Sequence, residues 1–449
     1  MIEQLTIENF LSFKERITFE FCASMEKPKL GYENIPWYQF NNKRKILKLQ
    51  FLFGNNGTGK SNFLNAIYSI CQLACRKSNS KTDDISRIPD FYFKFAEDSL
   101  HKPTYFKIIF HVNGKRYSYE ISCFNNTIVT ENLTRCDVGR KEMEIFRRSF
   151  NQADDIVEIK YPNKYISKEA QSIINDSVIS NTSVISIYDE KNILSEDLRD
   201  TYNYFYHIQW FPLLENIDLP SMFINRKDDK ELKKILIGLL NDLGSNIIDY
   251  KIETIEPKLS DQEILIFKTL FGEEEFKQKF AGGKRKIATL QFAHPADDVL
   301  KIGWLNETEE SEGTLNMIRL IIVLYDAIKL NVPVLIDECA SGIHQQTFGR
   351  IIQFFLYCSE NAQAFLASQH LSIMEMEGFR RDTMKFFDKN RETGETTCKK
   401  VDLRRYHKNI SILKAYLDNS FGSLPQFPTK EEWDLHLYKF KEEMAPVTK

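Results

Sequence analysis

A glycine-rich run between an apolar stretch and a helical pattern constrains this chain more than any other feature. Residues 46–53 are mostly apolar, which favours a strand, and Phe63, Ile67 and Ile70 then recur at helical spacing. Glycines let successive backbone N–H groups turn onto anionic oxygens, and the following helix directs its positive end there. The order of strand, loop and helix therefore predicts a phosphate-binding loop. Its residues are Gly54, Asn55, Asn56, Gly57, Thr58, Gly59, Lys60 and Ser61.

The two residues that end this loop predict the ligands. We expect Lys60 to lie on the β and γ phosphates of a nucleotide and to assist their transfer. The hydroxyl of Ser61 would bind Mg²⁺, which keeps several waters and so takes few protein ligands. ATP and Mg²⁺ are the cofactors that this loop predicts.

Two carboxylates end a second apolar strand, over residues 332–336. Asp337 and Glu338 follow it directly, at a position where uncompensated charge is costly unless a metal or a reaction uses it. Asp337 is the candidate partner of Mg²⁺. Glu338 is the candidate base that orients and deprotonates the water attacking the γ-phosphate. Surface acids that cap a strand are the alternative.

Two further segments hold candidate site residues. His370 follows the strand expected at residues 364–367, where its ring could reach a γ-phosphate oxygen, although a lone histidine is more often a surface or packed imidazole. Ser311 and Gly313 precede a helix whose apolar positions run from Leu315 to Ile328. Local physics makes Ser311 a helix N-cap.

The remaining pattern predicts an α/β fold with an insertion. Period-two alternation over residues 105–121, interrupted by Asn113-Gly114, indicates an antiparallel hairpin, and residues 230–243 and 261–271 have helical spacing. Helices and apolar strands alternate again in the last third of the chain, which favours a covered parallel sheet. We expect the first half of the head in residues 1–95, an antiparallel β lobe in 96–155, a helical arm or lid in 156–300 and the second half of the head in 301–449.

Composition and the pattern of the first residues limit the partners and the cellular location that we expect. Lys and Arg (60) nearly balance Asp and Glu (63), so no global field attracts nucleic acid or an anionic membrane. The first residues alternate apolar and acidic, unlike a secretory signal, and no apolar stretch approaches the roughly 20 residues that span a bilayer. We therefore expect a cytoplasmic protein that makes no membrane contact.

These motifs together resemble a known family. An Ile-Glu-Asn-Phe-Leu-Ser-Phe start, the glycine loop, a β lobe, Ser-Glu-Gly-Thr at residues 311–314, Leu-Ile-Asp-Glu at 335–338 and Ser-Gln-His at 368–370 resemble SMC-like ABC ATPases, with RecF and OLD-family ATPases sharing this head. The runs at residues 379–382 and 416–425 look like the compact ATPases of bacterial anti-phage systems. The resemblance implies an ABC-type P-loop ATPase head.

The resemblance also implies partners. In such ATPases the phosphate loop of one protomer is closed by Ser311 and Gly313 of another, with Ser341 and His344 along the interface, so a homo-oligomer is expected. We expect an ATPase sensor or scaffold for abortive infection. It would hold a separate toxic effector, a nuclease from an adjacent gene, and release it when a phage-encoded trigger is detected.

Two other functions compete with this one. An OLD-type nuclease would need an acidic metal-binding domain, but only about 110 residues follow Glu338, and the remaining sheet uses them. A RecF-like repair ATPase would bind duplex DNA, for example through the basic runs at residues 43–45 and 284–286. Short basic runs are more often solvated surface.

Overall fold

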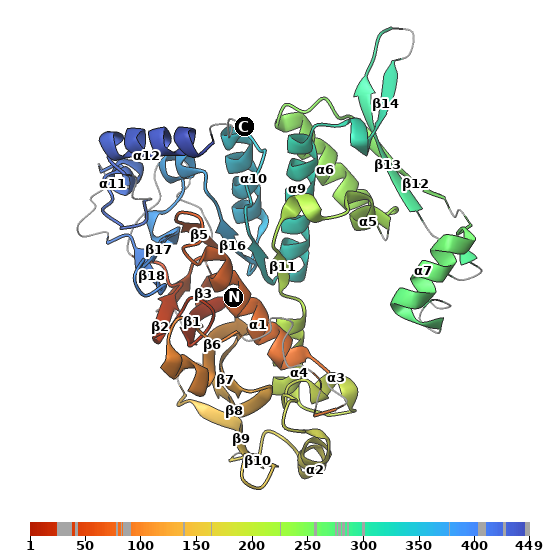
Figure 1. The fold of residues 1–449 in the computed structure, drawn as a ribbon. Coiled ribbons are helices and arrows are strands. Elements are labelled where there is room, and N and C mark those ends of the chain that lie inside the picture. Colours follow the sequence, from red (N-terminus) through yellow and green to blue (C-terminus); the bar gives the residue numbers. More distant parts are fainter. Residues whose placement is uncertain are drawn as a thin grey trace.

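The computed structural model describes residues 1–444 apart from 25–37, 41–43, 78–79, 82, 84–90, 138–139, 163, 225, 256–257, 274–275, 277–279, 281–282, 285–286, 299–300, 377, 403–409 and 425–427. Figure 1 shows a central α/β body, a β lobe below it and an arm that extends to one side.

A mainly parallel sheet forms the centre of the body. Its order is β11 (Gln209–Phe211), β15 (Pro333–Ile336), β16 (Gln363–Ala367), β5 (Leu49–Phe53), β17 (Met384–Lys389) and β18 (Thr396–Lys400), and only the β17–β18 pairing is antiparallel. Strands β5, β15 and β16 are buried along their whole length, as parallel strands covered on both faces must be. The predicted parallel sheet is confirmed.

Helices cover both faces of this sheet because alternate side chains of its strands point in opposite directions. Helix α1 (Lys60–Cys75) packs in one apolar core with Phe365 and Phe387. Helices α9 (Glu312–Leu330) and α10 (Gln345–Cys358) pack in the other with Phe51 and Phe386. The chain therefore forms a three-layer head around β5, the strand that enters the glycine loop.

The lobe is an antiparallel sheet that begins with the N-terminal strands. Its order is β10 (Ile156–Lys160), β9 (Met143–Asn151), β8 (Thr127–Cys136), β7 (Lys115–Phe124), β6 (Thr104–Val112), β1 (Ile2–Glu8) and β2 (Ile17–Glu20). Asn113 and Gly114 both have positive φ, +49° and +72°, which joins β6 to β7 by the tight turn expected from the sequence. A short hairpin, β3 (Tyr38–Phe40) with β4 (Arg44–Ile46), precedes β5.

The segment after the lobe contains strands as well as helices. Its helices are α2 (Lys168–Ser177), α3 (Ile187–Glu190), α4 (Glu196–Tyr206), α5 (Leu219–Ile224), α6 (Lys230–Asp242) and α7 (Asp261–Phe271). Strands β12 (Asp249–Ile255), β13 (Ile287–Pro295) and β14 (Ile302–Asn306) form a separate antiparallel sheet, which projects from the body beside α7 (Figure 1). The helices expected at 230–243 and 261–271 are confirmed, whereas no sequence pattern indicated that β11 joins the central sheet.

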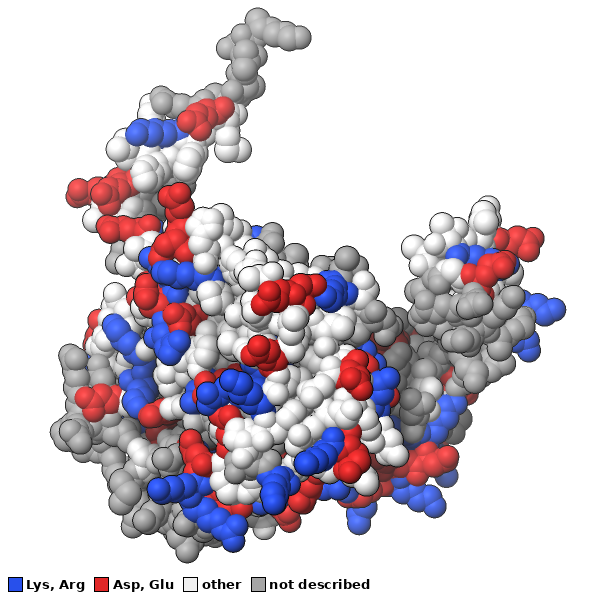
Figure 2. All heavy atoms as spheres, turned by 90° about the horizontal axis from the view of Figure 1, so that it is seen from below, with Lys and Arg blue, Asp and Glu red and all other residues white. Residues whose placement is uncertain are grey.

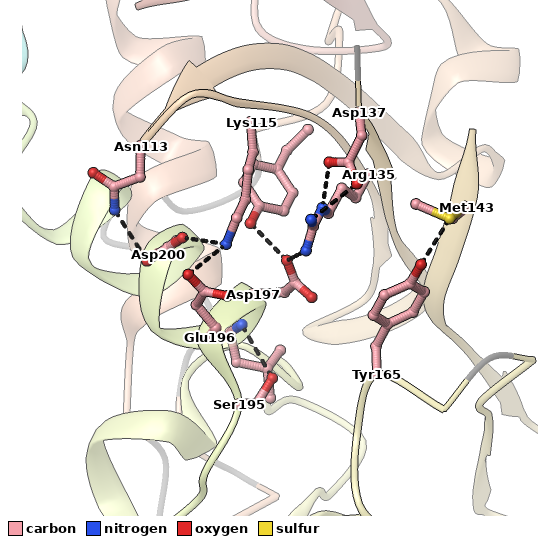
Figure 3. Close-up of polar contacts among 12 residues, drawn as sticks. Asn113, Lys115, Arg135, Asp137, Met143, Tyr165, Ser195, Glu196, Asp197 and Asp200 are labelled. Carbon is pink, nitrogen blue, oxygen red and sulfur yellow. Dashed lines mark hydrogen bonds and ion pairs between the residues drawn. The ribbon is translucent and has the colours of Figure 1, made fainter. Parts of the chain in front are cut away.

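A charged network fastens α4 to the lobe. Lys115 lies 2.8 Å from Glu196 and 3.1 Å from Asp200, and Arg135 lies between Asp137 (2.6 Å) and Asp197 (3.1 Å), as Figure 3 shows. Most of these side chains are half-buried or buried, and each opposes a partner of the other sign. The network is consistent with a structural role, since paired buried charges are costly to break.

The chain ends with α11 (Ile412–Leu417) and α12 (Lys430–Glu443). Among the residues described here, no helix combines the length and apolar character needed to cross a bilayer.

Candidate functional site

The phosphate loop, residues 54–61, lies at the carboxyl end of β5 in the middle of the central sheet. The Nζ atom of Lys60 donates to the carbonyl oxygens of Gly54 (2.8 Å) and Asn55 (2.9 Å), so the ammonium lies over the loop. Burial lowers the pKa of Lys60, and the opposing charges of Asp337 and Glu338 raise it in part. A buried cation in a glycine loop at a helix N-terminus is suited to bind polyphosphate.

Two glycines are required by close packing around this loop. A Cβ on Gly54, whose φ is +150°, would lie 2.5 Å from the carbonyl oxygen of Phe387. Gly59 has a φ of +104°, and a Cβ there would collide with Thr396. Any side chain at either position would deform the loop.

A serine and an aspartate from distant parts of the chain meet beside the loop. Ser61 Oγ donates a hydrogen bond to Asp337 Oδ2, and the other oxygen of Asp337 accepts the backbone N–H of Glu338 at 3.1 Å. Ser61 and Asp337 are 276 positions apart in the sequence. A hydroxyl and a carboxylate are hard oxygen donors of the kind that Mg²⁺ prefers, and a nucleotide-bound Mg²⁺ needs few protein ligands. Within the described residues, no cluster of three or more His, Cys, Asp or Glu side chains offers a fuller cage.

Glu338 lies on the exposed side of the same junction. Its φ is +47°, an uncommon conformation for a residue with a side chain, and it turns the chain sharply after β15. Gln369 Nε2 donates to Glu338 Oε1 at 3.0 Å. His370, which follows Gln369, is exposed, and its backbone N–H donates to Ser368 Oγ at 3.0 Å. The ends of β15 and β16 therefore bring the 338 and 369–370 positions together at one sheet edge.

The signature segment, residues 311–314, lies at the start of α9. Ser311 caps the helix by accepting the backbone N–H of Thr314 at 3.1 Å, and both Ser311 and Glu312 are exposed. A Cβ on Gly313 would lie 2.5 Å from the carbonyl oxygen of Gly342. The signature segment thus packs against Gly342, which lies between the predicted interface residues Ser341 and His344 in the sequence.

Two residues that support the loop were missed from the sequence. The single hydroxyl proton of Thr396 is shared between the carbonyl oxygen of Thr58 (2.9 Å) and Ser12 Oγ (2.7 Å), and Ser12 also accepts from Asn62 at 2.7 Å. These bonds join the β1–β2 turn, the loop and β18. Gln369 was also missed as a partner of Glu338. Neither contact has a motif, because each depends on the register of strands far apart in the chain.

A cavity of about 550 Å³ opens next to the phosphate loop. Residues 55–58 form one wall, residues 388–394 form another, and Phe95, Ser423 and Leu424 complete the lining. Phe95 is 70% exposed, and the ammonium of Lys389 lies 5.6 Å from its ring centre. The loop is therefore accessible from solvent on this side.

Several solved structures are similar to this chain at low sequence identity. No curated protein matches the chain. The SMC head domain from Thermotoga maritima is 12% identical over 89% of this chain and 99% of that one (TM-score 0.41), and the Smc head domain of Pyrococcus furiosus, bound to the C-terminal domain of ScpA, is 13% identical over 93% and 99% (0.38). The recombination mediator RecF is 13% identical over 89% and 98% (0.34). At such TM-scores the fold assignment rests on the sheet order given above.

A family model described as "AAA domain, putative AbiEii toxin, Type IV TA system" matches residues 49–375, from the strand before the phosphate loop to beyond His370. The chain has an α/β fold in which a mainly parallel central sheet is joined to an antiparallel β lobe, and it belongs to this family of AAA domains.

Proposed function

We propose that this protein binds and hydrolyses ATP with Mg²⁺ at the phosphate loop. The observation that carries the proposal is the junction of Ser61 with Asp337, which places two oxygen donors from opposite ends of the chain beside Lys60. Mg²⁺ held there would neutralise charge on the β and γ phosphates. Lys60 would bind the same phosphates, and Glu338 would accept the proton of the attacking water.

His370 and the signature segment complete the proposed mechanism. His370 would donate to a γ-phosphate oxygen from the end of β16. Ser311 and Gly313 are exposed or half-exposed on the other half of the head, which supports a composite site in which they bind the γ-phosphate held by a second copy. We infer a homo-oligomer whose ATP sites form between protomers.

The test of hydrolysis compares the wild type with Glu338→Gln. We expect Mg²⁺-dependent phosphate release by the wild type, a loss of about 100-fold or more in the variant, and ATP affinity that is unchanged within error. Glu360→Gln, an exposed acid after α10, is the matched control and should keep the wild-type rate. Wild-type turnover by Glu338→Gln would remove Glu338 as the base.

We further propose that the ATPase acts as a sensor or scaffold in anti-phage abortive infection. The C-terminal runs resemble the PARIS ATPase AriA, and the family description names a toxin and a Type IV TA system, which supports a toxin–antitoxin or defence setting. The protein would hold a separate effector nuclease and release it on meeting a phage-encoded trigger. Co-expression with the neighbouring reading frame tests this: co-purification of a nuclease supports it, and a neighbour that neither binds nor restricts phage with this chain refutes it.

Duplex-DNA binding of the RecF kind has less support. Figure 2 shows Lys and Arg interspersed with Asp and Glu over the face seen from below, and a face of mixed sign does not favour binding to phosphate backbones. Of the two basic runs, Lys43, Arg285 and Lys286 lie outside the described residues.

A further inference from the structure

Helix α12 is a well-specified helix that is exposed on every side. Its start has a reciprocal capping arrangement: Thr429 Oγ1 accepts the backbone N–H of Glu432 at 3.3 Å, and Glu432 Oε2 accepts the backbone N–H of Thr429 at 2.8 Å. Each α12 side chain that the structure describes is exposed, and α12 lies at the periphery of the molecule in Figure 1. A helix of this length is marginal in water unless a packed face stabilises it.

The apolar residues of α12 follow a coiled-coil pattern. Trp433, Leu437, Phe440 and Met444 are separated by steps of four, three and four residues, which is the d-a-d-a spacing of a heptad seam. Their side chains are 49%, 46%, 50% and 82% exposed. Met444 continues the helix, since its backbone N–H donates to the carbonyl oxygen of Phe440 at 2.9 Å. This continuous apolar seam is one that a second helix would cover.

The charges beside the seam identify the second helix. Positions e are Asp434 and Lys441, and positions g are His436 and Glu443. In an antiparallel pair, e faces e and g faces g, so Asp434 of each copy would meet Lys441 of the other and His436 would meet Glu443.

The same antiparallel register also pairs the apolar residues of the seam: it places Leu437 opposite Phe440 and Trp433 opposite Met444. In a parallel pair, g faces e, so His436 would meet Lys441, and this contact brings no attraction between opposite charges.

We propose that α12 pairs in an antiparallel manner with α12 of a second copy of this chain, forming a two-fold contact that needs no nucleotide. The helix is self-complementary about its centre, as an isologous interface requires. Two heptads make a small interface, so we expect association in the micromolar range rather than a permanent dimer. Any contact between ATPase heads would strengthen it by raising the effective concentration of the two helices.

The proposal is tested on the full chain without nucleotide, in a Lys60→Ala background that removes ATP-driven association. Sedimentation velocity over a range of micromolar concentrations should show a reversible monomer–dimer equilibrium. Leu437→Glu places two charges in the seam and should weaken the dimer by about tenfold or more. Leu435→Glu is the matched control: Leu435 is as exposed (53%) but occupies an f position outside the seam, so the dimer should persist.

A charge exchange separates this pairing from simple damage to the helix. Asp434→Lys and Lys441→Asp should each weaken the dimer of its own kind, because like charges then meet across the e positions. A mixture of the two variants should form a heterodimer with both attractive pairs restored, and the double variant should dimerise like the parent. A chain that stays monomeric at every concentration would overturn the proposal. So would a dimer that Leu437→Glu leaves intact, or a mixture of the charge variants that remains monomeric.

Discussion

The phosphate loop and the signature segment are the two halves of one proposed site, and they differ in the contacts that hold them in place. Contacts within one chain hold the phosphate loop in place. The Lys60 ammonium donates to a carbonyl oxygen of the loop, and Thr396 hydrogen-bonds both Thr58 and Ser12. The signature segment is held by the bonds of Ser311 with Thr314, by the Glu312–Arg319 pair (2.6 Å) and by the close approach of Gly313 to Gly342, and Ser311 and Glu312 are exposed. In the proposed composite site, nucleotide binding is therefore organised within one chain, whereas hydrolysis requires the signature segment of a second.

Lys60→Ala gives the largest effect expected on the loop side. Removing a buried ammonium from the phosphates should weaken ATP binding by at least about 100-fold, because charge-assisted bonds to phosphate are among the strongest in proteins. Isothermal titration calorimetry with ATP and Mg²⁺ measures this. The exposed Lys77→Ala, just after α1, should bind as the wild type does. Equal affinities for Lys60→Ala and the wild type would remove the loop from the site.

Ser311→Asp tests the open half. Aspartate keeps the helix cap but would repel a γ-phosphate arriving from the other protomer, so ATP should still bind while hydrolysis falls by about tenfold or more. Ser311→Thr keeps the hydroxyl and should retain activity. Rates of phosphate release and affinities from the same preparations separate the two effects.

Mixing variants sharpens the division between the halves. A Lys60→Ala chain supplies an intact signature segment, and a Ser311→Asp chain supplies an intact phosphate loop. Each should keep about a tenth of the wild-type rate or less when alone, but random pairing should restore one native site in half of the dimers, or about a quarter of the wild-type rate. A mixture with no more activity than its parts would mean that both halves act within one chain or that both sites must be intact.

Thr396→Val tests the internal support of the loop with a smaller effect. Losing the hydroxyl removes bonds to Thr58 and Ser12, which should weaken ATP binding by about three- to tenfold. Thr397→Val, the exposed neighbour on β18, is the matched control. An affinity like that of the wild type would show that the loop is ordered without the Thr396 hydroxyl.

Features that depend on short sequence motifs could be predicted for this molecule, whereas contacts between distant strands could not. The turn at Asn113 and Gly114 has its own chemistry, and the meeting of Ser61 with Asp337 follows because parallel strands end at one sheet edge. The bonds of Thr396 to Ser12, 384 residues apart, and the entry of β11 into the central sheet depend on strand registers that no short motif records. The catalytic roles assigned to Glu338 and His370 stay predictions.

The smallest expected effect concerns the contact between strand β1 and the central sheet that carries the phosphate loop. Glu3 on β1 accepts from His111 (2.7 Å) and Arg116 (2.8 Å), while its neighbour Ile2 exchanges hydrogen bonds with Gln363 on β16 of the central sheet. Burial alone would raise the pKa of Glu3, but the bonds from His111 and Arg116 outweigh it and lower the pKa to about 2.

A carboxylate whose pKa is lowered on folding stabilises the fold above its unfolded pKa, and this contribution is lost as the pH falls toward about 2. Glu3→Gln should therefore lower the Tm by a few degrees at pH 7, with the difference shrinking below about pH 4. Glu8 lies on the same strand as Glu3 and forms an exposed pair with Arg16, so Glu8→Gln should change the Tm little at any pH. A difference for Glu3→Gln that stays constant from pH 7 to pH 3 would mean that the shape of the side chain, rather than its charge, holds the lobe to the sheet that carries the phosphate loop.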